Sequence, residues 1–197
     1  MSSPSVSTEA RGARAASFGS LTLRDLILLA LIAALCMLAK QVLRIPIHIP
    51  GHSGVLWVAL FVVARGLVDK RGAGLLLGIV TGLLAMFMGF GANQGPFEWT
   101  KWVAAGATLD VMAAVLPGEL RSPLKAALVG AAVHLAKLTA MVLVSLMLRL
   151  PLAIIALGLG WSATTHVVFG VVGGLLGALA LRELRKVPAL DAQARGS

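Results

Sequence analysis

Long apolar runs separated by short polar breaks are the feature that most constrains this chain. The run from Leu26 to Ala39, for example, contains no charged residue. A helix needs ~20 apolar residues to cross ~30 Å of hydrocarbon, and a backbone without water must form a helix or a closed barrel. The runs do not alternate with polar residues, which favours helices. Because 58% of the residues are hydrophobic and 13% are charged, against roughly a quarter charged in an average soluble domain, the sequence predicts an all-α membrane protein.

The breaks divide residues 21–186 into a bundle of six expected transmembrane helices. Glycine, proline and charged residues mark the breaks, and Thr22 with Asp25 forms a capping-box pattern at the first helix. The polar flanks, 1–20 and 187–197, are predicted to be cytoplasmic tails, the first of them disordered. The expected helices are 22–43, 54–68, 73–90, 97–116 and 124–150, followed by a short apolar segment at 152–160 that leads into a sixth helix ending near 181.

Positive charge is distributed unequally between the two sides of such a bundle. Of the 17 lysines and arginines, twelve lie on the side of the termini and four on the other, with Lys137 inside a span. Cytoplasmic connections carry the positive excess, so both termini are predicted to be cytoplasmic and no nucleic-acid partner is needed to explain the net charge. Cys36 is alone, which excludes a disulfide within the chain. The first run lacks an A-x-A-like cleavage site and is interpreted as a retained span.

A few ionisable side chains are expected inside the membrane, where they usually face the bundle interior or an aqueous cavity. At ~1.5 Å of rise per residue, Asp110 and Lys137 each lie roughly 18 Å from the outer ends of their helices and are expected to be level. They therefore form either a structural ion pair or part of a ligand site. His134 shares a helix face with Lys137, and His166 reaches a similar depth. Each histidine is either a ligand contact or bonded to a backbone carbonyl.

Two stretches are expected near the outer surface. "NQGPFEWTKW" places Glu98, Lys101 and Trp102 on one helix face, which suits a polar, ring-bearing ligand, although tryptophans also serve as interface anchors. "RIPIHIPGHSGVLW" reads as a semi-rigid lid, because its prolines stiffen the backbone and its glycines allow tight turns. Pro50-Gly51 argues against a helical metal pair, which leaves substrate or lid contacts for the lid histidines. The candidate substrate-binding residues are thus His48, His52, Asn93, Glu98, Trp99, Lys101, Trp102, Asp110, His134, Lys137, Trp161 and His166, with no metal ligand among them.

Small residues recur at four-residue spacing on three of the expected helices. Such ladders allow helix backbones to approach closely in lipid. The glycines of the third and sixth helices, Gly74, Gly78 and Gly82, and Gly170, Gly173, Gly174 and Gly177, are expected to pack inside the bundle. Ala30 and Ala34 on the first helix form an AxxxA pattern that either packs internally or docks another subunit.

These stretches together resemble the S components of energy-coupling factor (ECF) transporters, membrane subunits that bind a vitamin or another micronutrient. The resemblance covers residues 21–186 and rests on the six-span layout and on three stretches. They are the opening "LTLRDLILLALIAAL" with its AxxxA, the loop "IPIHIPGHSG" after the first helix, and "HVVFGVVGGLLGALALREL" as the closing helix. The family is held together by fold more than by sequence.

The resemblance implies a carrier in the plasma membrane of a prokaryote. In such families the loop after the first helix closes over a ligand held near the outer surface among helices four to six. Ala30 and Ala34 would contact a shared transmembrane T component, which two cytoplasmic ATPases drive, and the S component is thought to topple to deliver its ligand. This chain has no G-x-x-x-x-G-K-[ST] loop, so ATP hydrolysis would belong to those partners and no cofactor is expected here.

Two other functions are weighed against this expectation. A cobalt or nickel carrier would use histidines, but related metal-binding subunits have one directly after the initiator methionine and this chain begins "MSSPS". An intramembrane enzyme acting on lipid would need a nucleophile with a base, or clustered carboxylates for a metal. Asp110 and Glu98 are the only acids expected in the membrane, and H-E-x-x-H and G-x-S-x-G motifs are absent from the sequence. The chain is therefore not expected to be an enzyme. A purely structural scaffold would have no use for Lys137 and His134 within its spans.

Overall fold

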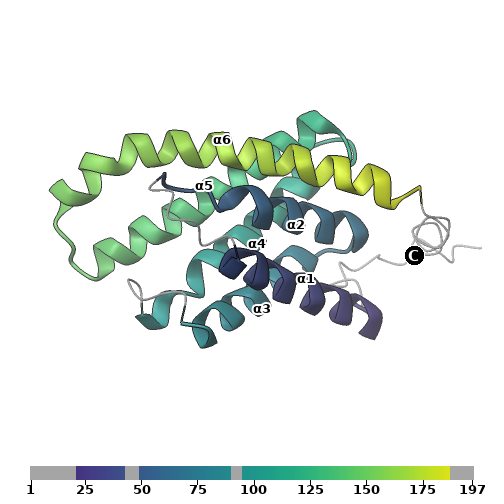
Figure 1. Cartoon of the computed structure of the whole chain (residues 1–197), viewed down its shortest axis with the longest axis horizontal. Helices are drawn as coiled ribbons and strands as arrows, with labels where there is room; N and C mark the ends of the chain where they lie inside the picture. Colours follow the sequence, from purple (N-terminus) through teal and green to yellow (C-terminus); the bar gives the residue numbers. More distant parts are fainter. Residues whose placement is uncertain (1–20, 43–48, 90–94, 187–197) are drawn as a thin grey trace, which may run out of the picture.

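The protein is all-helical in the residues that the computed structural model describes, which are 21–42, 49–89 and 95–186 (Figure 1). Within these ranges there are six α-helices and one 3-10 turn. The predicted tails, 1–20 and 187–197, and the candidate residues His48 and Asn93 lie outside them. The helices are α1 (Leu23–Val42), α2 (Gly54–Leu67), α3 (Ala73–Phe87), α4 (Thr100–Val115), α5 (Pro123–Met147) and α6 (Leu152–Leu184), and the 3-10 turn is η1 (Gly95–Phe97).

Local sequence signals set several of the helix ends. At the start of α1 the capping box is confirmed: the Thr22 hydroxyl accepts the Asp25 N–H at 3.3 Å, and the Asp25 carboxylate accepts the Thr22 N–H at 2.8 Å. Gly72 precedes α3 with a φ of 85°, a left-handed conformation that glycine adopts without steric cost. Pro123 occupies the first turn of α5, where its missing N–H has no intrahelical partner to lose.

The last apolar stretch is one continuous helix, which corrects the expected separate segment at 152–160. α6 runs unbroken for 33 residues from Leu152, directly after Pro151. Gly158 and Gly160 do not interrupt the helix, because a glycine inside a helix costs only about 1 kcal/mol relative to alanine. No proline follows Pro151 inside the helix, so nothing stronger than this small penalty opposes helix formation.

Two of the helices, α5 and α6, are long and apolar enough to cross a membrane. α2 and α3 are apolar but shorter, with 14 and 15 residues. α5 packs along α6, α6 also covers α2, and α4 lies between α3 and α5, whereas α1 packs on α2 and α3. In Figure 1, α6 runs along one side of the molecule and α1 and α3 lie on the other, and the α5–α6 hairpin extends past the remaining helices.

The α5–α6 contact depends on glycines, as the sequence pattern predicts. The Cα atoms of Gly130 and Gly170 face each other's backbone, and a Cβ on Gly170 would lie 2.6 Å from the Gly130 carbonyl oxygen. The predicted ladder glycines of α3 and α6 are all buried. Close backbone approach of this kind is typical of helix pairs that pack in lipid.

We expect Gly170→Ala to lower the free energy of unfolding by about 1–3 kcal/mol, because α5 and α6 must separate to admit the methyl group. Gly158→Ala in the same helix is the matched control. Nothing lies within 4 Å of the position of its Cβ, so it should gain up to ~1 kcal/mol of helix propensity. Unfolding can be followed through Cys36, the only cysteine, whose buried thiol reacts with a fluorophore only when the bundle opens. Equal effects of the two substitutions would contradict close packing at Gly170.

Candidate functional site

Buried aromatic and basic side chains from four helices meet around Lys137. We name this group the Lys137 cluster: Trp57 of α2, Trp102 of α4, His134 and Lys137 of α5, and His166 of α6, all of them buried. The Lys137 ammonium nitrogen lies 4.1 Å from the centroid of the Trp102 ring and 4.5 Å from that of Trp57. A cation over an indole face is attracted by the ring quadrupole. Among the residues that the structure describes, no carboxylate pairs with Lys137.

The aromatic rings of the cluster hold one another in edge-to-face contacts. Trp57 lies 5.3 Å from Trp102 at an interplanar angle of 76°, and 5.2 Å from His134 at 80°. Such arrangements are the preferred geometry of aromatic pairs and make the group rigid. Both indole N–H groups are buried and have no hydrogen-bond partner within the described residues. Because buried donors are nearly always paired in proteins, these two unpaired donors mark the Lys137 cluster as a candidate site.

The two histidine rings lie next to each other at a tilt of 39°, and their tautomers follow from their contacts. Nδ1 of His134 lies 2.9 Å from the His166 carbonyl oxygen, and Nδ1 of His166 lies 2.7 Å from the Ser162 carbonyl oxygen. A carbonyl oxygen only accepts hydrogen bonds, so both Nδ1 atoms carry the proton, and Nε2 of a neutral ring is then an acceptor. The ring centroids are 4.3 Å apart. The pair therefore offers two Nε2 acceptors side by side.

A short turn before α2 lies directly on this histidine pair. A Cβ on Gly51 would be 2.9 Å from Nδ1 of His166, and one on Gly54 would overlap the His134 ring. Only glycine allows the backbone to approach the rings so closely. His52 points elsewhere in this turn, with its Nδ1 2.7 Å from the Ile49 carbonyl oxygen. The described part of the "IPIHIPGHSG" loop thus covers the imidazoles.

Glu98 and Lys101 form a buried ion pair next to the cluster. Their side chains meet at 2.6 Å and both are buried, whereas the second carboxylate oxygen of Glu98 has no partner among the described residues. Lys40 lies on the other side, 5.1 Å from the Trp102 ring centroid. The charges of Lys40, Lys101 and Glu98 all act on Lys137. In the part of the chain that the structure describes, Lys101 and Lys137 thus lie near a single carboxylate, that of Glu98, and an anionic ligand would interact favourably with their ammonium forms.

The expected pairing of Asp110 with Lys137 is wrong. Asp110 instead accepts hydrogen bonds from the Arg65 guanidinium at 2.8 Å and from the backbone N–H groups of Gly74 and Leu75 at 3.1 and 2.9 Å. A carboxylate is stabilised at a helix N-terminus, here that of α3. Asp110 therefore fastens α2, α3 and α4 together and does not belong to the Lys137 cluster.

The error came from assuming that the helix ends are level. Asp110 and Lys137 are each ten residues from one end of their helices, or about 15 Å. However, Lys137 lies beside Trp102, in the first turn of α4. The last ten residues of α5 therefore extend past α4, and Asp110 lies eight residues, about 12 Å, further along α4 than the cluster.

The remaining candidates are divided between the cluster and the surface. Trp102, His134, Lys137 and His166 come together as described, and Glu98 and Lys101 lie beside them. Trp99 and Trp161 are exposed, with 41% and 62% of their surface accessible. This exposure fits the alternative role of tryptophan as a membrane-interface anchor better than membership of the cluster. Sequence reasoning missed Trp57 and Lys40 as neighbours of Lys137. Trp57 lies one helical turn after Gly54, on the same helix face. This spacing could have predicted that Trp57 lies near the glycine-rich turn.

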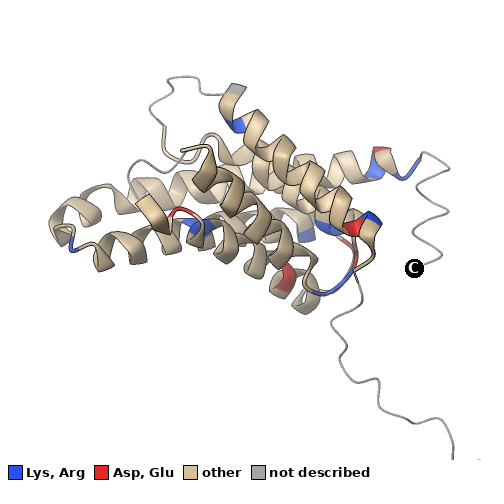
Figure 2. Ribbon diagram, turned by 90° about the horizontal axis from the view of Figure 1, so that it is seen from below, with Lys and Arg blue, Asp and Glu red and all other residues tan. Residues whose placement is uncertain are grey.

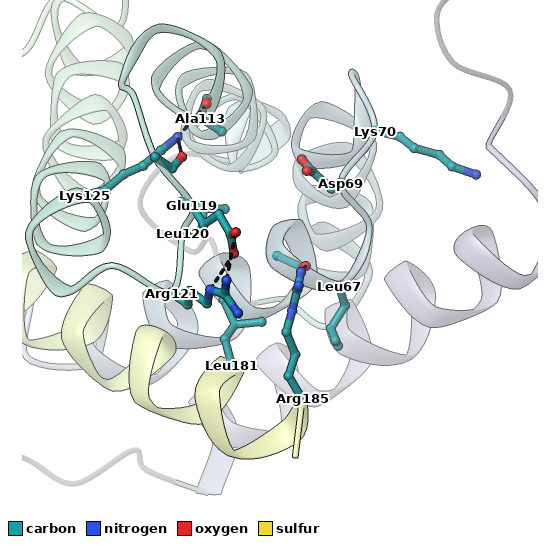
Figure 3. A pocket seen from close by; sticks show the side chains of 12 residues that line it. Leu67, Asp69, Lys70, Ala113, Glu119, Leu120, Arg121, Lys125, Leu181 and Arg185 are labelled. Atoms are coloured by element: carbon teal, nitrogen blue, oxygen red, sulfur yellow. Dashed lines mark hydrogen bonds and ion pairs between the residues drawn. The ribbon is translucent and has the colours of Figure 1, made fainter. Parts of the chain in front are cut away.

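A cavity of about 430 Å³ lies at the other end of the bundle, between the α2–α3 turn, the α4–α5 connection and the end of α6 (Figure 3). Lys125 reaches across to donate to the carbonyl oxygens of Ala113, Leu116 and Gly118 at 2.9, 2.6 and 2.6 Å. Arg121 pairs with Glu119 across the opening. Because the last carbonyls of α4 need partners, the contacts of Lys125 are structural.

Within the described ranges, no group of three or more His, Cys, Asp or Glu side chains is placed to hold a metal ion. What the geometry offers is a buried site with one ammonium group, two free indole N–H donors, two imidazole acceptors and an unsatisfied carboxylate oxygen. Comparison of the chain with protein-family models, curated proteins and solved structures finds no match.

Proposed function

We propose that this protein is the substrate-binding S component of an ECF-type importer, which captures a vitamin or related micronutrient at the outer face of a prokaryotic plasma membrane. The observation that carries the proposal is the Lys137 cluster: a charged group buried under two indole rings with no ion-pair partner in the described residues. Burying an unpaired charge is expensive. Such a cost is expected where a ligand supplies the missing countercharge.

The proposed membrane arrangement has six spans and two cytoplasmic termini. Two long apolar helices and the positive excess of the sequence on the side of the termini support it. Most charged residues lie at the end of the bundle where the chain leaves α6, as the ribbon of Figure 2 indicates. In this arrangement that end faces the cytoplasm, and the turn at residues 49–53 and the Lys137 cluster lie toward the outside. A ligand would then reach the cluster when this turn moves away from the histidines.

The first helix provides the proposed docking face for the T component. Ala30 and Ala34 are both exposed, and the larger apolar residues around them, Ile27, Leu31 and Leu35, are 52%, 64% and 49% exposed. Small residues between larger ones form a shallow groove in which a helix of another subunit can pack closely. The two cytoplasmic ATPases would act through this partner.

We expect Ala30→Leu to impair uptake and to leave ligand binding unchanged, because the larger side chain fills the docking groove on a face away from the cluster. Ala180→Leu on the exposed surface of α6 is the matched control and should affect neither. Uptake is measured in cells that produce the full transporter, and binding is measured on the purified subunit. Normal uptake by the Ala30→Leu protein would remove this helix as the docking face.

The direct test of the proposed function is the identification of what the protein carries. The protein is purified in mild detergent, then denatured, and the released small molecules are identified by mass spectrometry. A stoichiometric, water-soluble micronutrient supports the carrier. A protein that is folded, empty and able to modify lipid would replace the proposal with an enzymatic function.

A further inference from the structure

We infer that the substrate is a small ring compound that carries N–H donors on one edge and a carboxylate on another. The inference rests on the proposed function and adds the chemistry of the substrate to it. It follows from the hydrogen-bonding groups that the Lys137 cluster leaves unpaired, taken one side at a time.

The histidine side of the cluster requires donors from the ligand. Nδ1–H of His134 already donates to the His166 carbonyl oxygen, and Nδ1–H of His166 donates to that of Ser162. The neighbouring ammonium of Lys137, one turn from His134, disfavours a second positive charge on the rings. Nε2 of each ring is therefore an acceptor. Two adjacent acceptors are matched by ring or amide N–H groups, and a ligand without them would leave both acceptors unpaired.

The lysine side requires an acceptor with negative charge. Lys137 and the buried indole N–H groups of Trp57 and Trp102 are all donors, and none has a hydrogen-bond partner in the described residues. A carboxylate offers about four lone-pair positions and one negative charge, which suits one ammonium and two N–H groups. A divalent cation would also use the imidazole acceptors, but Lys137 and Lys101 would repel it.

The two sides are close enough for one small molecule to reach both. His134 and Lys137 are three residues apart on α5, an axial rise of about 4.5 Å. The indole rings of Trp57 and Trp102 form part of the cluster, and such aromatic surroundings favour a ligand that contains a ring. A single ring or a fused pair of rings with both kinds of group satisfies this arrangement.

The first experiment compares matched compounds by their effect on the unfolding temperature and by their dissociation constants. Purified protein is tested with sets of ring compounds that carry both groups, only N–H donors, or only a carboxylate, represented by orotate, uracil and benzoate. We expect compounds of the first set to bind at least 10-fold more tightly than the matched compounds that lack one group. Tighter binding by a single-group set, or stronger protection by Co²⁺ or Ni²⁺, would overturn the inference and leave the carrier function standing.

The second experiment tests the histidine acceptor with His134→Phe, which keeps a ring but removes Nε2. The wild type should prefer an N–H ligand from the first set over its N-methyl analogue by about 10-fold, the effect of one hydrogen bond. His134→Phe should lose this preference, whereas Arg121→Gln, at the other end of the bundle, should keep it. Because both ligands are compared on the same variant, a change in stability cancels.

Two results of the second experiment would count against the inference. A preference that persists in His134→Phe would show that this imidazole does not accept the ligand proton. If a folded protein, purified with nothing bound, responds to no ring compound at all, the inference fails, whereas the carrier function is judged separately by the identity of the co-purified compound.

Discussion

Replacing Asp110 with alanine is expected to lower the free energy of unfolding by about 3 kcal/mol, the cost of leaving a buried charge without its partner. The Arg65 side chain is only 6% exposed and would lose its buried partner. Two backbone N–H groups at the start of α3, those of Gly74 and Leu75, would also lose their acceptor. Loss of the carboxylate thus removes hydrogen bonds that hold α2, α3 and α4 together. The unfolding temperature, read from the reaction of Cys36 with a thiol-reactive fluorophore, measures the effect.

Asp69 provides a control on the same arginine. It pairs with Arg65 at 2.7 Å but its side chain is 86% exposed, and exposed ion pairs contribute only about 0–1 kcal/mol. Asp69→Ala should therefore be nearly neutral. Asp110→Asn should lie between the two, because the amide oxygen still accepts a backbone N–H at the start of α3. If Asp110→Ala were as mild as Asp69→Ala, Asp110 would have no structural role of the kind described.

Lys137→Met should reduce ligand binding by roughly 30- to 1000-fold and leave the unfolding temperature unchanged or higher. Truncating one member of a buried charge pair costs about 2–4 kcal/mol of binding, which corresponds to this range. In the protein without ligand, by contrast, the ammonium has only the faces of Trp57 and Trp102 as partners within the described residues. Methionine fills a similar volume without the cost of burying a charge. Binding of the co-purified compound and the unfolding temperature are measured on the same sample.

Lys101→Met separates this explanation from a general effect of removing a buried lysine. Lys101 pairs at 2.6 Å with Glu98, whose side chain is 1% exposed. Its removal leaves a buried carboxylate unpaired and should destabilise the protein. If Lys137→Met destabilised the protein to the same extent as Lys101→Met, the Lys137 cluster would be a structural feature and not a binding site.

The secondary structure was largely predictable because its signals are local. The capping box at Thr22 and Asp25, the turn at Gly72 and the prolines before α5 and α6 act within a few residues of where they occur. The spacing of the glycines likewise predicted which helix faces pack closely. The separate segment predicted at 152–160 was wrong because its two glycines, each costing a helix only about 1 kcal/mol, are too weak a signal to end it.

The candidate site was predictable in its residue types and only in part in its geometry. One helix-face assignment holds, since His134 and Lys137 are buried together on α5, and Lys101 and Trp102 are likewise buried on α4. The assignment of Glu98 to the same helix face was wrong, because Glu98 lies in the turn before α4. Face assignments follow from the 3.6-residue period within a single helix. Whether these faces bind a ligand stays a prediction.

The sequence by itself determined the order and approximate extent of the helices and the period on which their polar groups recur. Only the tertiary structure decided which polar groups meet: Asp110 with Arg65, and Lys137 with two indoles. The physical reason is that the axial offset between two packed helices depends on backbone contacts between them. A change of a few helical turns in this offset gives every side chain a different partner while each helix stays the same. No local sequence pattern predicts the offset.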